Sequence, residues 1–263
     1  MNNDKTVGNV NLISSEEERI AEFLKERNLE KVNAESAKVT PADSFYVRHG
    51  KRFLDLLISV PVFVIFLPLN LIFGICTFFD VGCPIFFKQT RTGKDGKPFT
   101  IVKFRNMNEK KDAEGKLLPA HERVTKFGYF MRKYSFDELL NFWSIIKGDM
   151  SIIGPRPLPV FFYDRLSNRH RMRCIVRPGL ECPRVIDVEG ELYQKQFEND
   201  IWYVENISFL TDCRLVFLLV KFTFSKKIRD VSAVGGSYFV GYGDDGGALY
   251  KELALEKYKD MID

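Results

Sequence analysis

The sequence predicts a mainly α-helical membrane protein with one small β-hairpin. Residues 56–79 form an uncharged run as long as a membrane helix, and residues 209–224 form a second apolar run that scattered charges interrupt. Between them, two β-rich segments at 84–90 and 97–104 flank a turn. We expect four parts in chain order: an amphipathic N-terminal extension (1–45), a membrane helix (46–83), a larger domain (84–228), and a glycine-rich tail with a short closing helix (229–263).

Composition and charge narrow the class of protein. The 263 residues, 45% of them apolar, suffice for one large domain or two small ones. The net charge is only +4, but basic residues gather at 169–177 and beside the long apolar run, which suits lipid headgroups or phosphates. Nucleic acid would suit the charge too, but no recognition helix or aromatic platform supports it. Five cysteines without a CxxC pair, beside three histidines, indicate neither a disulfide framework nor a zinc cluster, so we expect a reducing compartment.

The N-terminal extension is expected to form a short amphipathic helix. Residues 1–30 are rich in charge and lack the apolar core of a signal peptide, so we expect the N-terminus to stay in the cytoplasm. Ser15 and Glu18 make a capping box, and Ile20, Phe23 and Leu24 follow at helical spacing. A packing or solubilising role is favoured over binding of a partner.

The long apolar run has the wrong shape for a simple membrane span. A helix over residues 56–79 would be about 36 Å long, against a hydrocarbon core of roughly 30 Å. Pro61 and Pro68 lie inside it and predict a bend. Both flanks are basic, and the positive-inside rule places such flanks on the cytoplasmic side. A re-entrant helix broken at Pro68 satisfies both constraints. A kinked span with a translocated C-terminal domain and a buried core helix are the alternatives.

The second apolar run predicts a helix in the membrane interface. Asp212, Arg214 and Lys221 make residues 209–224 a poor span, and two lysines close the run. A helix with its apolar side in the bilayer and its lysines toward anionic headgroups accounts for this pattern. A buried helix of a globular domain is the alternative.

The β-rich segments predict a hairpin just above the membrane. Residues 92–96, Thr-Gly-Lys-Asp-Gly, are typical of a turn. The hairpin would bring together four basic side chains: Lys88, Arg91, Lys103 and Arg105. Of these, Lys103 and Arg105 are candidate phosphate-binding residues. The Gly-Lys pair is not a phosphate-binding P-loop, because the first glycine and the final hydroxyl residue of that motif are missing.

An acidic pair, Asp137 and Glu138, lies at the start of a predicted helix. Apolar residues recur at helical spacing from position 136 to 146, and Gly148 is placed to end the helix. A purely structural explanation is available. Ser135 and Glu138 form a capping box, and Asp137 would complement the positive end of the helix.

The same segment also has the residue types that phosphoryl chemistry needs. A helix N-terminus beside Arg132 and Lys133 attracts phosphate, an ionised Asp137 can attack phosphorus, and Glu138 can hold a divalent cation. Farther on, Arg156 lies between two prolines, and Arg177 precedes Pro-Gly. Guanidinium groups fixed in this way suit phosphate oxygens, although each arginine alone is more often a surface or structural residue.

Taken together, these segments resemble the monotopic phosphoglycosyl transferases, the bacterial sugar transferase family of polyprenyl-phosphate sugar-1-phosphate transferases. The resemblance extends from about residue 51 to 224. Its carriers are Lys51-Arg52 with Asp55, Pro68, Gln89, Arg91, Gly93, Lys103-Phe104-Arg105 with Met107, the 135–140 segment, Lys147-Gly148-Asp149-Met150-Ser151, Gly154-Pro155-Arg156-Pro157, Arg177-Pro178-Gly179, Tyr203-Val204 and Asn206-Ile207-Ser208.

The resemblance implies a monotopic protein on the cytoplasmic face of the bacterial inner membrane. Its re-entrant helix, interfacial helices and small cytoplasmic catalytic domain would act on a UDP-sugar and a polyprenyl (undecaprenyl) phosphate. Asp137 would take the sugar phosphate and release UMP, and the lipid phosphate would then attack the covalent intermediate. Glu138 would bind Mg²⁺, and Lys103, Arg132 and Arg156 would contact phosphates. This would be the first membrane step of glycoconjugate or exopolysaccharide assembly.

Three departures from the family pattern leave an alternative open. Leu67 replaces a serine often found before the proline, residues 180–187 differ from the usual loop, and the tail at 229–263 matches no family motif. We expect the tail to be a flexible connector before a closing helix at 248–261. The alternative function is an inactive relative that serves as a membrane scaffold. Charged helices at both ends would also allow a homo-oligomer.

Overall fold

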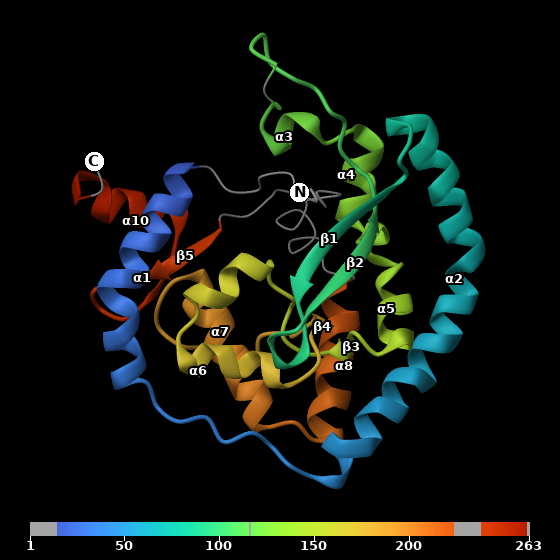
Figure 1. Ribbon diagram of the computed structural model, residues 1–263. Helices are drawn as coiled ribbons and strands as arrows, with labels where there is room; N and C mark the ends of the chain where they lie inside the picture. Colours follow the sequence, from blue (N-terminus) through green and yellow to red (C-terminus); the bar gives the residue numbers. More distant parts are fainter. Residues whose placement is uncertain (1–14, 116, 224–237, 262–263) are drawn as a thin grey trace, which may run out of the picture.

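The computed structural model describes residues 15–115, 117–223 and 238–261. It is mostly helical, as expected, and Figure 1 shows a long curved helix, α2, along one side of a compact body. The longer helices are α1 (Ser15–Glu35), α2 (Lys51–Val81), α4 (Lys126–Lys133), α5 (Asn141–Lys147), α7 (Leu192–Glu205), α8 (Phe209–Thr223) and α10 (Lys251–Tyr258). The described residues also include two short helices, α3 (Ala120–Arg123) and α6 (Asn168–Arg171).

Three two-stranded sheets connect these helices. The hairpin expected at 84–104 is confirmed, because β1 (Phe86–Thr92) pairs antiparallel with β2 (Pro98–Phe104). β3 (Ser151–Ile153) and β4 (Gly179–Glu181) form a parallel pair, and β5 (Phe239–Tyr242) pairs antiparallel with β6 (Ala248–Tyr250). Glycine is required at the first residue of β4, since a Cβ on Gly179 would lie 2.2 Å from the backbone nitrogen of Gly154.

The break expected in the membrane helix at Pro68 is not present, because α2 continues as one helix through both Pro61 and Pro68. Instead, the helix curves around the body (Figure 1). Both prolines are exposed, on the side away from the body. A proline removes one helical hydrogen bond and pushes its own side of the helix outward, so prolines on the outer side favour a bend toward the core rather than an interruption.

α2 has two different faces. Its inner face is buried against the body toward both ends of the helix: Asp55 and Ser59 near the start, and Asn70, Phe73, Gly74 and Thr77 near the end. Its outer face exposes large apolar side chains, among them Leu57, Val64, Ile65, Leu71, Ile75 and Phe79. Together with the short π-helix Tyr46–Gly50 before it, α2 is long and apolar enough to cross a membrane.

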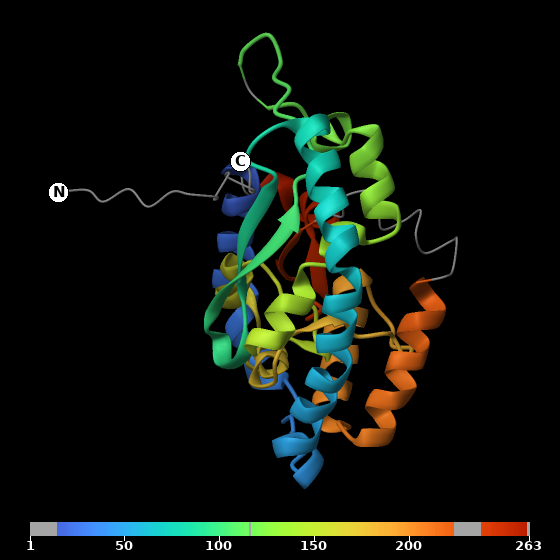
Figure 2. The same cartoon turned by 90° about the vertical axis from the view of Figure 1, so that its right-hand side faces the viewer.

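α8 shares this two-sided pattern. Phe209, Leu210 and Phe217 are exposed, whereas Asp212 and Leu215 are buried. Figure 2 shows α8 beside the N-terminal part of α2.

A buried polar network fixes the start of α2 to α8. The ammonium group of Lys51 lies 2.8 Å from Asp212 Oδ2, and the hydroxyl of Tyr203 donates to Asp212 Oδ1 at 2.8 Å. Lys51 also donates to the backbone carbonyl of Ile153 at 3.0 Å, and the hydroxyl oxygen of Tyr203 lies 3.1 Å from the same carbonyl oxygen. A buried charge pair of this kind is stable only when its remaining lone pairs are satisfied, as they are here. The network sets the position of α2 relative to the core.

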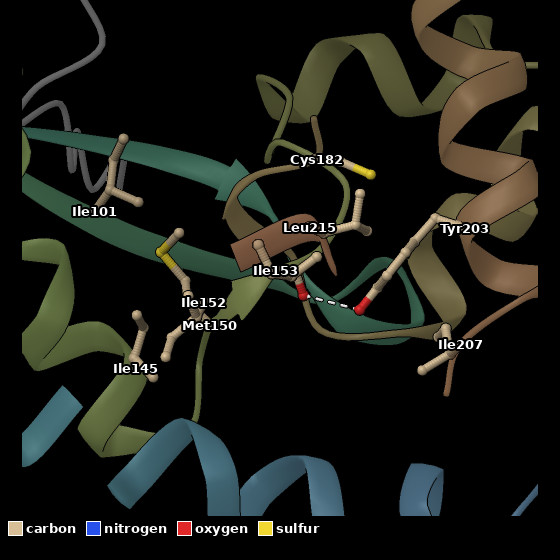
Figure 3. Close-up of a cluster of buried hydrophobic side chains, with 9 residues drawn as sticks. All are labelled: Ile101, Ile145, Met150, Ile152, Ile153, Cys182, Tyr203, Ile207 and Leu215. Carbon is tan, nitrogen blue, oxygen red and sulfur yellow. Dashed lines mark hydrogen bonds between the residues drawn. The ribbon is translucent and has the colours of Figure 1, made fainter. Parts of the chain in front are cut away.

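The main hydrophobic core is formed by side chains from β2, β3, α5, α7 and α8, among other residues (Figure 3). Its buried members are Ile101, Ile145, Met150, Ile152, Ile153, Cys182, Tyr203, Ile207 and Leu215. The segment that carries Asp137 is therefore attached to this core at both ends, by the hairpin that precedes it and by α5 that follows it.

The glycine-rich segment near the C-terminus differs from the expected flexible connector. Its described part, 238–261, is the β5–β6 hairpin followed by α10, so the expected closing helix begins at Lys251 rather than at Ala248. This hairpin and α10 bury Val240, Leu249 and Ala254 against Ile20 and Leu24 of α1. The N-terminal helix therefore has the packing role that was favoured. Residues 224–237 lie outside the described residues.

Candidate active site

The acidic pair lies on a tight turn rather than inside a helix. Asp137 and Glu138 belong to a single 3₁₀ turn, Phe136–Glu138, and α5 begins only at Asn141. The capping box predicted for Ser135 is wrong, because Ser135 has a left-handed backbone (φ 56°) and its side chain makes no capping bond. The predicted helix end at Gly148 is confirmed.

The left-handed Ser135 separates this turn from α4. Such a backbone costs a non-glycine residue about 1–2 kcal/mol and persists only where the surroundings impose it. Here the Phe136 ring stacks on Phe73 of α2, with ring centroids 5.0 Å apart. α2 thereby holds the residue that precedes Asp137.

Glu138 is held by two cations. Lys103 Nζ donates to its Oε1 at 2.5 Å and Arg156 donates to the same oxygen at 3.0 Å. Although burial opposes ionisation, Arg156 and Lys103 lower the pKa of Glu138 to about 2. Glu138 is therefore a carboxylate at neutral pH.

Arg156 is held in place from two sides, as its flanking prolines predict. Its guanidinium also donates to Glu181 Oε2 at 3.0 Å, and its backbone carbonyl accepts a bond of 3.0 Å from Arg173. Arg173 in turn forms a buried ion pair with Asp200 of α7, at 2.6 Å. An arginine fixed in this way presents its remaining donors in one direction, which suits an oxyanion.

Asp137 is the more buried acid, with 7% of its surface exposed. Asn106 follows the hairpin, and its Nδ2 donates to Oδ2 of Asp137 at 3.1 Å. The Oδ1 of Asn106 accepts a hydrogen bond from Arg132, also at 3.1 Å. Burial raises the pKa of Asp137; Lys103 and Arg132 oppose that shift, and Glu138 adds to it. The carboxylate is thus poorly solvated, a state that favours a nucleophile.

The structure brings together three of the five predicted phosphate-binding residues. Lys103, Arg132 and Arg156 surround the acidic pair. Arg105 instead binds the carbonyl oxygens of Val81 and Gly82 at the end of α2, the latter at 3.2 Å.

Arg177 donates to the carbonyl of Gly148, just after α5, at 3.0 Å. Both arginines satisfy carbonyls that a helix end leaves unpaired. Their spacing in the sequence gives no sign of this role.

Three residues of the site were not among the predicted site residues. Asn106 and Glu181 contact predicted members directly, as described above. Arg91 of β1 lies near Arg156 and Glu138, and burial together with Arg156 lowers its pKa to about 10. The hairpin register could have indicated Arg91, since residues of alternate positions share one face of a strand.

The carboxylates of the site could hold a divalent cation only together with the phosphates of a bound substrate. Among the described residues there is no group of three His, Cys, Asp or Glu side chains that could hold a metal ion. Asp137 and Glu138 are two carboxylates, and Mg²⁺ is commonly held by one or two carboxylates together with substrate phosphates. Lys103 and Arg156 both bind Oε1 of Glu138, so its Oε2 is the oxygen that fits a cation.

Comparison with known proteins finds similarity to sugar transferases. The family model "Bacterial sugar transferase" matches residues 46–226. The "Uncharacterized sugar transferase EpsL" of Bacillus subtilis (strain 168) is 40% identical over 166 residues, which is 62% of this chain and 82% of that protein.

Two relatives with named substrates are more distant. A "UDP-N-acetylgalactosamine-undecaprenyl-phosphate N-acetylgalactosaminephosphotransferase" of Aeromonas hydrophila is 33% identical over 180 residues, covering 65% of this chain and 43% of that protein. A "UDP-glucose:undecaprenyl-phosphate glucose-1-phosphate transferase" of Klebsiella pneumoniae is 32% identical over 184 residues, covering 65% and 39%. The chain thus spans less than half the length of these two relatives. The matched region contains α2, the hairpin and the acidic pair with its cations, and this chain belongs to the bacterial sugar transferase family.

Proposed function

We propose that this protein transfers a sugar 1-phosphate from a UDP-sugar to a polyprenyl phosphate and releases UMP, with Asp137 as the covalent nucleophile. The observation that carries the proposal is a buried carboxylate, Asp137, beside a second carboxylate that two fixed cations bind. The names of the Aeromonas and Klebsiella relatives support both substrates.

In the first half of the reaction, a carboxylate oxygen of Asp137 attacks the sugar-bearing phosphorus of the UDP-sugar. The bond from that phosphorus to the bridging oxygen breaks, and UMP leaves with the electron pair. Two like charges must approach for this step, so positive groups must neutralise the diphosphate. Arg156 and Arg132 are held in place for this role, and Lys103 lies between the acids.

In the second half, an oxygen of the polyprenyl phosphate attacks the same phosphorus. The bond between phosphorus and Asp137 breaks, the sugar diphosphate lipid forms, and the carboxylate is restored. An acyl phosphate exposed to water hydrolyses, and the burial of Asp137 limits access of water to the intermediate.

Glu138 would hold Mg²⁺ together with the diphosphate of the substrate. Bound there, the cation would neutralise phosphate charge and act as a Lewis acid. The low pKa of Glu138 keeps this carboxylate ionised for the purpose at neutral pH.

The proposed topology is monotopic, with α2 entering the cytoplasmic leaflet of the inner membrane and both of its ends on the cytoplasmic side. The body packs against α2 toward both ends of its inner face rather than beyond one end of the helix, so lipid would contact the exposed apolar outer face. The exposed apolar residues of α8 continue that surface beside the start of α2 (Figure 2). A bilayer would cover both.

UMP release from a panel of UDP-sugars tests the reaction. Detergent-solubilised protein is assayed with and without undecaprenyl phosphate, with Asp137→Asn as the control and with EDTA followed by added Mg²⁺. We expect UMP from at least one sugar, dependence of turnover on the lipid, loss of activity in the variant, and loss that Mg²⁺ restores. A folded wild-type protein that releases no UMP from any sugar would favour the inactive scaffold, and an active Asp137→Asn protein would exclude Asp137 as nucleophile.

A further inference from the structure

The geometry points to Asn106 as a positioning residue that holds Oδ2 of Asp137, so that Oδ1 is the oxygen that attacks phosphorus. This inference rests on the proposed function and deepens it. Its basis is a chain of two hydrogen bonds, from Arg132 to Asn106 and from Asn106 to Asp137, each 3.1 Å long.

An asparagine is chemically suited to this place. Its carboxamide has an acceptor oxygen and two donor hydrogens, so one side chain can accept from a guanidinium and donate to a carboxylate. In the structure Oδ1 of Asn106 accepts from Arg132 Nε, and Nδ2 donates to Asp137 Oδ2. The positive guanidinium fixes which way the amide points. An aspartate here would place a second negative charge against Asp137, and an alanine would leave both neighbours without this bond.

The backbone of Asn106 is held as firmly as its side chain. A Cβ on Gly128 would lie 2.1 Å from the carbonyl oxygen of Asn106, so α4 approaches this carbonyl as closely as only glycine permits. Thr125 caps α4 by accepting from Gly128, and its own amide reaches the Asn106 carbonyl at 3.4 Å. Gly128 and Arg132 are four residues apart, so one face of α4 fixes both the main chain and the amide of Asn106.

This arrangement has one consequence for Asp137. Its Oδ2 is occupied by the amide of Asn106, which leaves Oδ1 for the attack on phosphorus. A carboxylate held through one oxygen keeps the other in a fixed direction, and a reacting group held in the right geometry reacts faster. Asn106 therefore acts on the rate of the chemical step rather than on the binding of the UDP-sugar.

The kinetics of UMP release test the role of Asn106. We compare wild-type protein with Asn106→Ala and, as the control, with Asn108→Ala, which removes only a local bond from the backbone amide of Lys110. For Asn106→Ala we expect kcat for UMP release to fall about tenfold or more, the value of a hydrogen bond to a charged group. KM for the UDP-sugar should stay within about twofold, because the lost bond orients the nucleophile and not the sugar nucleotide. Asn108→Ala should match wild type.

The outcomes keep this inference separate from the proposed reaction. A wild-type kcat in Asn106→Ala, with Asp137→Asn inactive, overturns the role of Asn106 and leaves the reaction intact. A loss in Asn106→Ala that comes from KM alone, with kcat unchanged, overturns that role as well. If Asp137→Asn stays active, the reaction as proposed fails, whatever the Asn106 variants do.

A shorter donor guards against a variant that does not fold. Asn106→Ser keeps a hydroxyl that can donate to Asp137 but cannot span the distance to Arg132 as well. If Asn106→Ala unfolds, Asn106→Ser should show a kcat below that of wild type with KM for the UDP-sugar within about twofold. A kcat equal to that of wild type overturns the bridging role.

Discussion

Arg156 donates to Oε1 of Glu138 at 3.0 Å, and this ion pair joins the proline-rich loop to the turn that carries the acidic pair. Arg156 approaches from the segment after β3, whereas Glu138 precedes α5, so the pair closes the site between two parts of the body. The same guanidinium also binds Glu181 of β4. One arginine therefore holds two carboxylates in place beside Asp137.

Replacing Arg156 by lysine tests whether the guanidinium group, which binds two carboxylates through separate nitrogens, is needed for activity. Arg156→Lys keeps the charge but cannot bind Glu138 and Glu181 through two separate nitrogens. We expect kcat/KM for UMP release to fall about ten- to a hundredfold, with a small change in the melting temperature. The matched control is Arg184→Lys, because the Arg184 side chain is exposed. Equal losses in both variants would remove the special role of Arg156.

The pH dependence of the reaction should follow the burial of Asp137. Its folded-state pKa is raised, chiefly by burial, and only the ionised form is a nucleophile. Activity is therefore full above the raised pKa and is lost as the pH falls through it, at a higher pH than for a solvent-exposed aspartate. The low pKa of Glu138, about 2, places its own titration well below this range. Stopped-flow or coupled measurement of UMP release gives the profile. An acidic limb as low as that of Glu138 would assign the nucleophile elsewhere.

The left-handed residue before the turn offers a test on stability. Ser135 has φ 56°, and its side chain makes no capping bond. Ser135→Gly should change the free energy of unfolding by less than about 0.5 kcal/mol, because relief of the backbone strain offsets the extra entropy of the unfolded glycine. Ser135→Val should lower it by about 1–2 kcal/mol, since β-branched residues strongly avoid this conformation. Chemical denaturation in detergent measures both. A valine variant as stable as the glycine variant would contradict the left-handed backbone.

The two ends of the chain should stabilise one another. Leu24 of α1 is fully buried in the cluster that contains Val240 and Leu249 of the C-terminal hairpin. Leu24→Ala should lower the free energy of unfolding by about 2–5 kcal/mol, as expected for a buried leucine. Leu192→Ala is the control, because 55% of that side chain is exposed, and it should change stability by less than about 0.5 kcal/mol. Equal melting temperatures for the two variants would mean that α1 does not pack on the hairpin in solution.

The membrane topology is tested by the accessibility of the two termini. Epitope tags are placed at each end, and protease is added to intact spheroplasts and to inverted membrane vesicles. A re-entrant or interfacial α2 predicts that both tags are cleaved only in the inverted vesicles, because both flanks of α2 stay in the cytoplasm. A protein of known spanning topology serves as the control. Cleavage of one tag from each side would show that α2 spans the bilayer.

Periodicity and local residue types predicted several parts of this structure. The apolar run of α2, the two-sided α8 and the β1–β2 hairpin were all expected from their patterns, because burial and strand pairing follow residue types that are neighbours in the sequence. The proline-flanked Arg156 was expected to be fixed for the same local reason. Lys103, Arg132 and Arg156 were named from the sequence as cations of the site, and the structure places them around the acidic pair.

Long-range contacts decided the remainder. The capping box at Ser135 was a sound local expectation, but packing of Phe136 on Phe73 of α2 imposes a left-handed residue and a 3₁₀ turn instead. Pro68 was expected to break α2, yet its position on the outer face lets the helix bend around the body without interruption.

The sequence by itself determined the family, the apolar helix and the identities of the acids and cations, because residue type and spacing are written in it. Only the tertiary structure decided which of these residues meet. The bridge from Arg132 through Asn106 to Asp137 joins residues 26 and 31 positions apart. The packing of α1 on the C-terminal hairpin joins Asn28 to the carbonyl of Tyr242, which is 214 positions away. Contacts over such separations depend on how whole elements pack, and no local pattern in the chain records that.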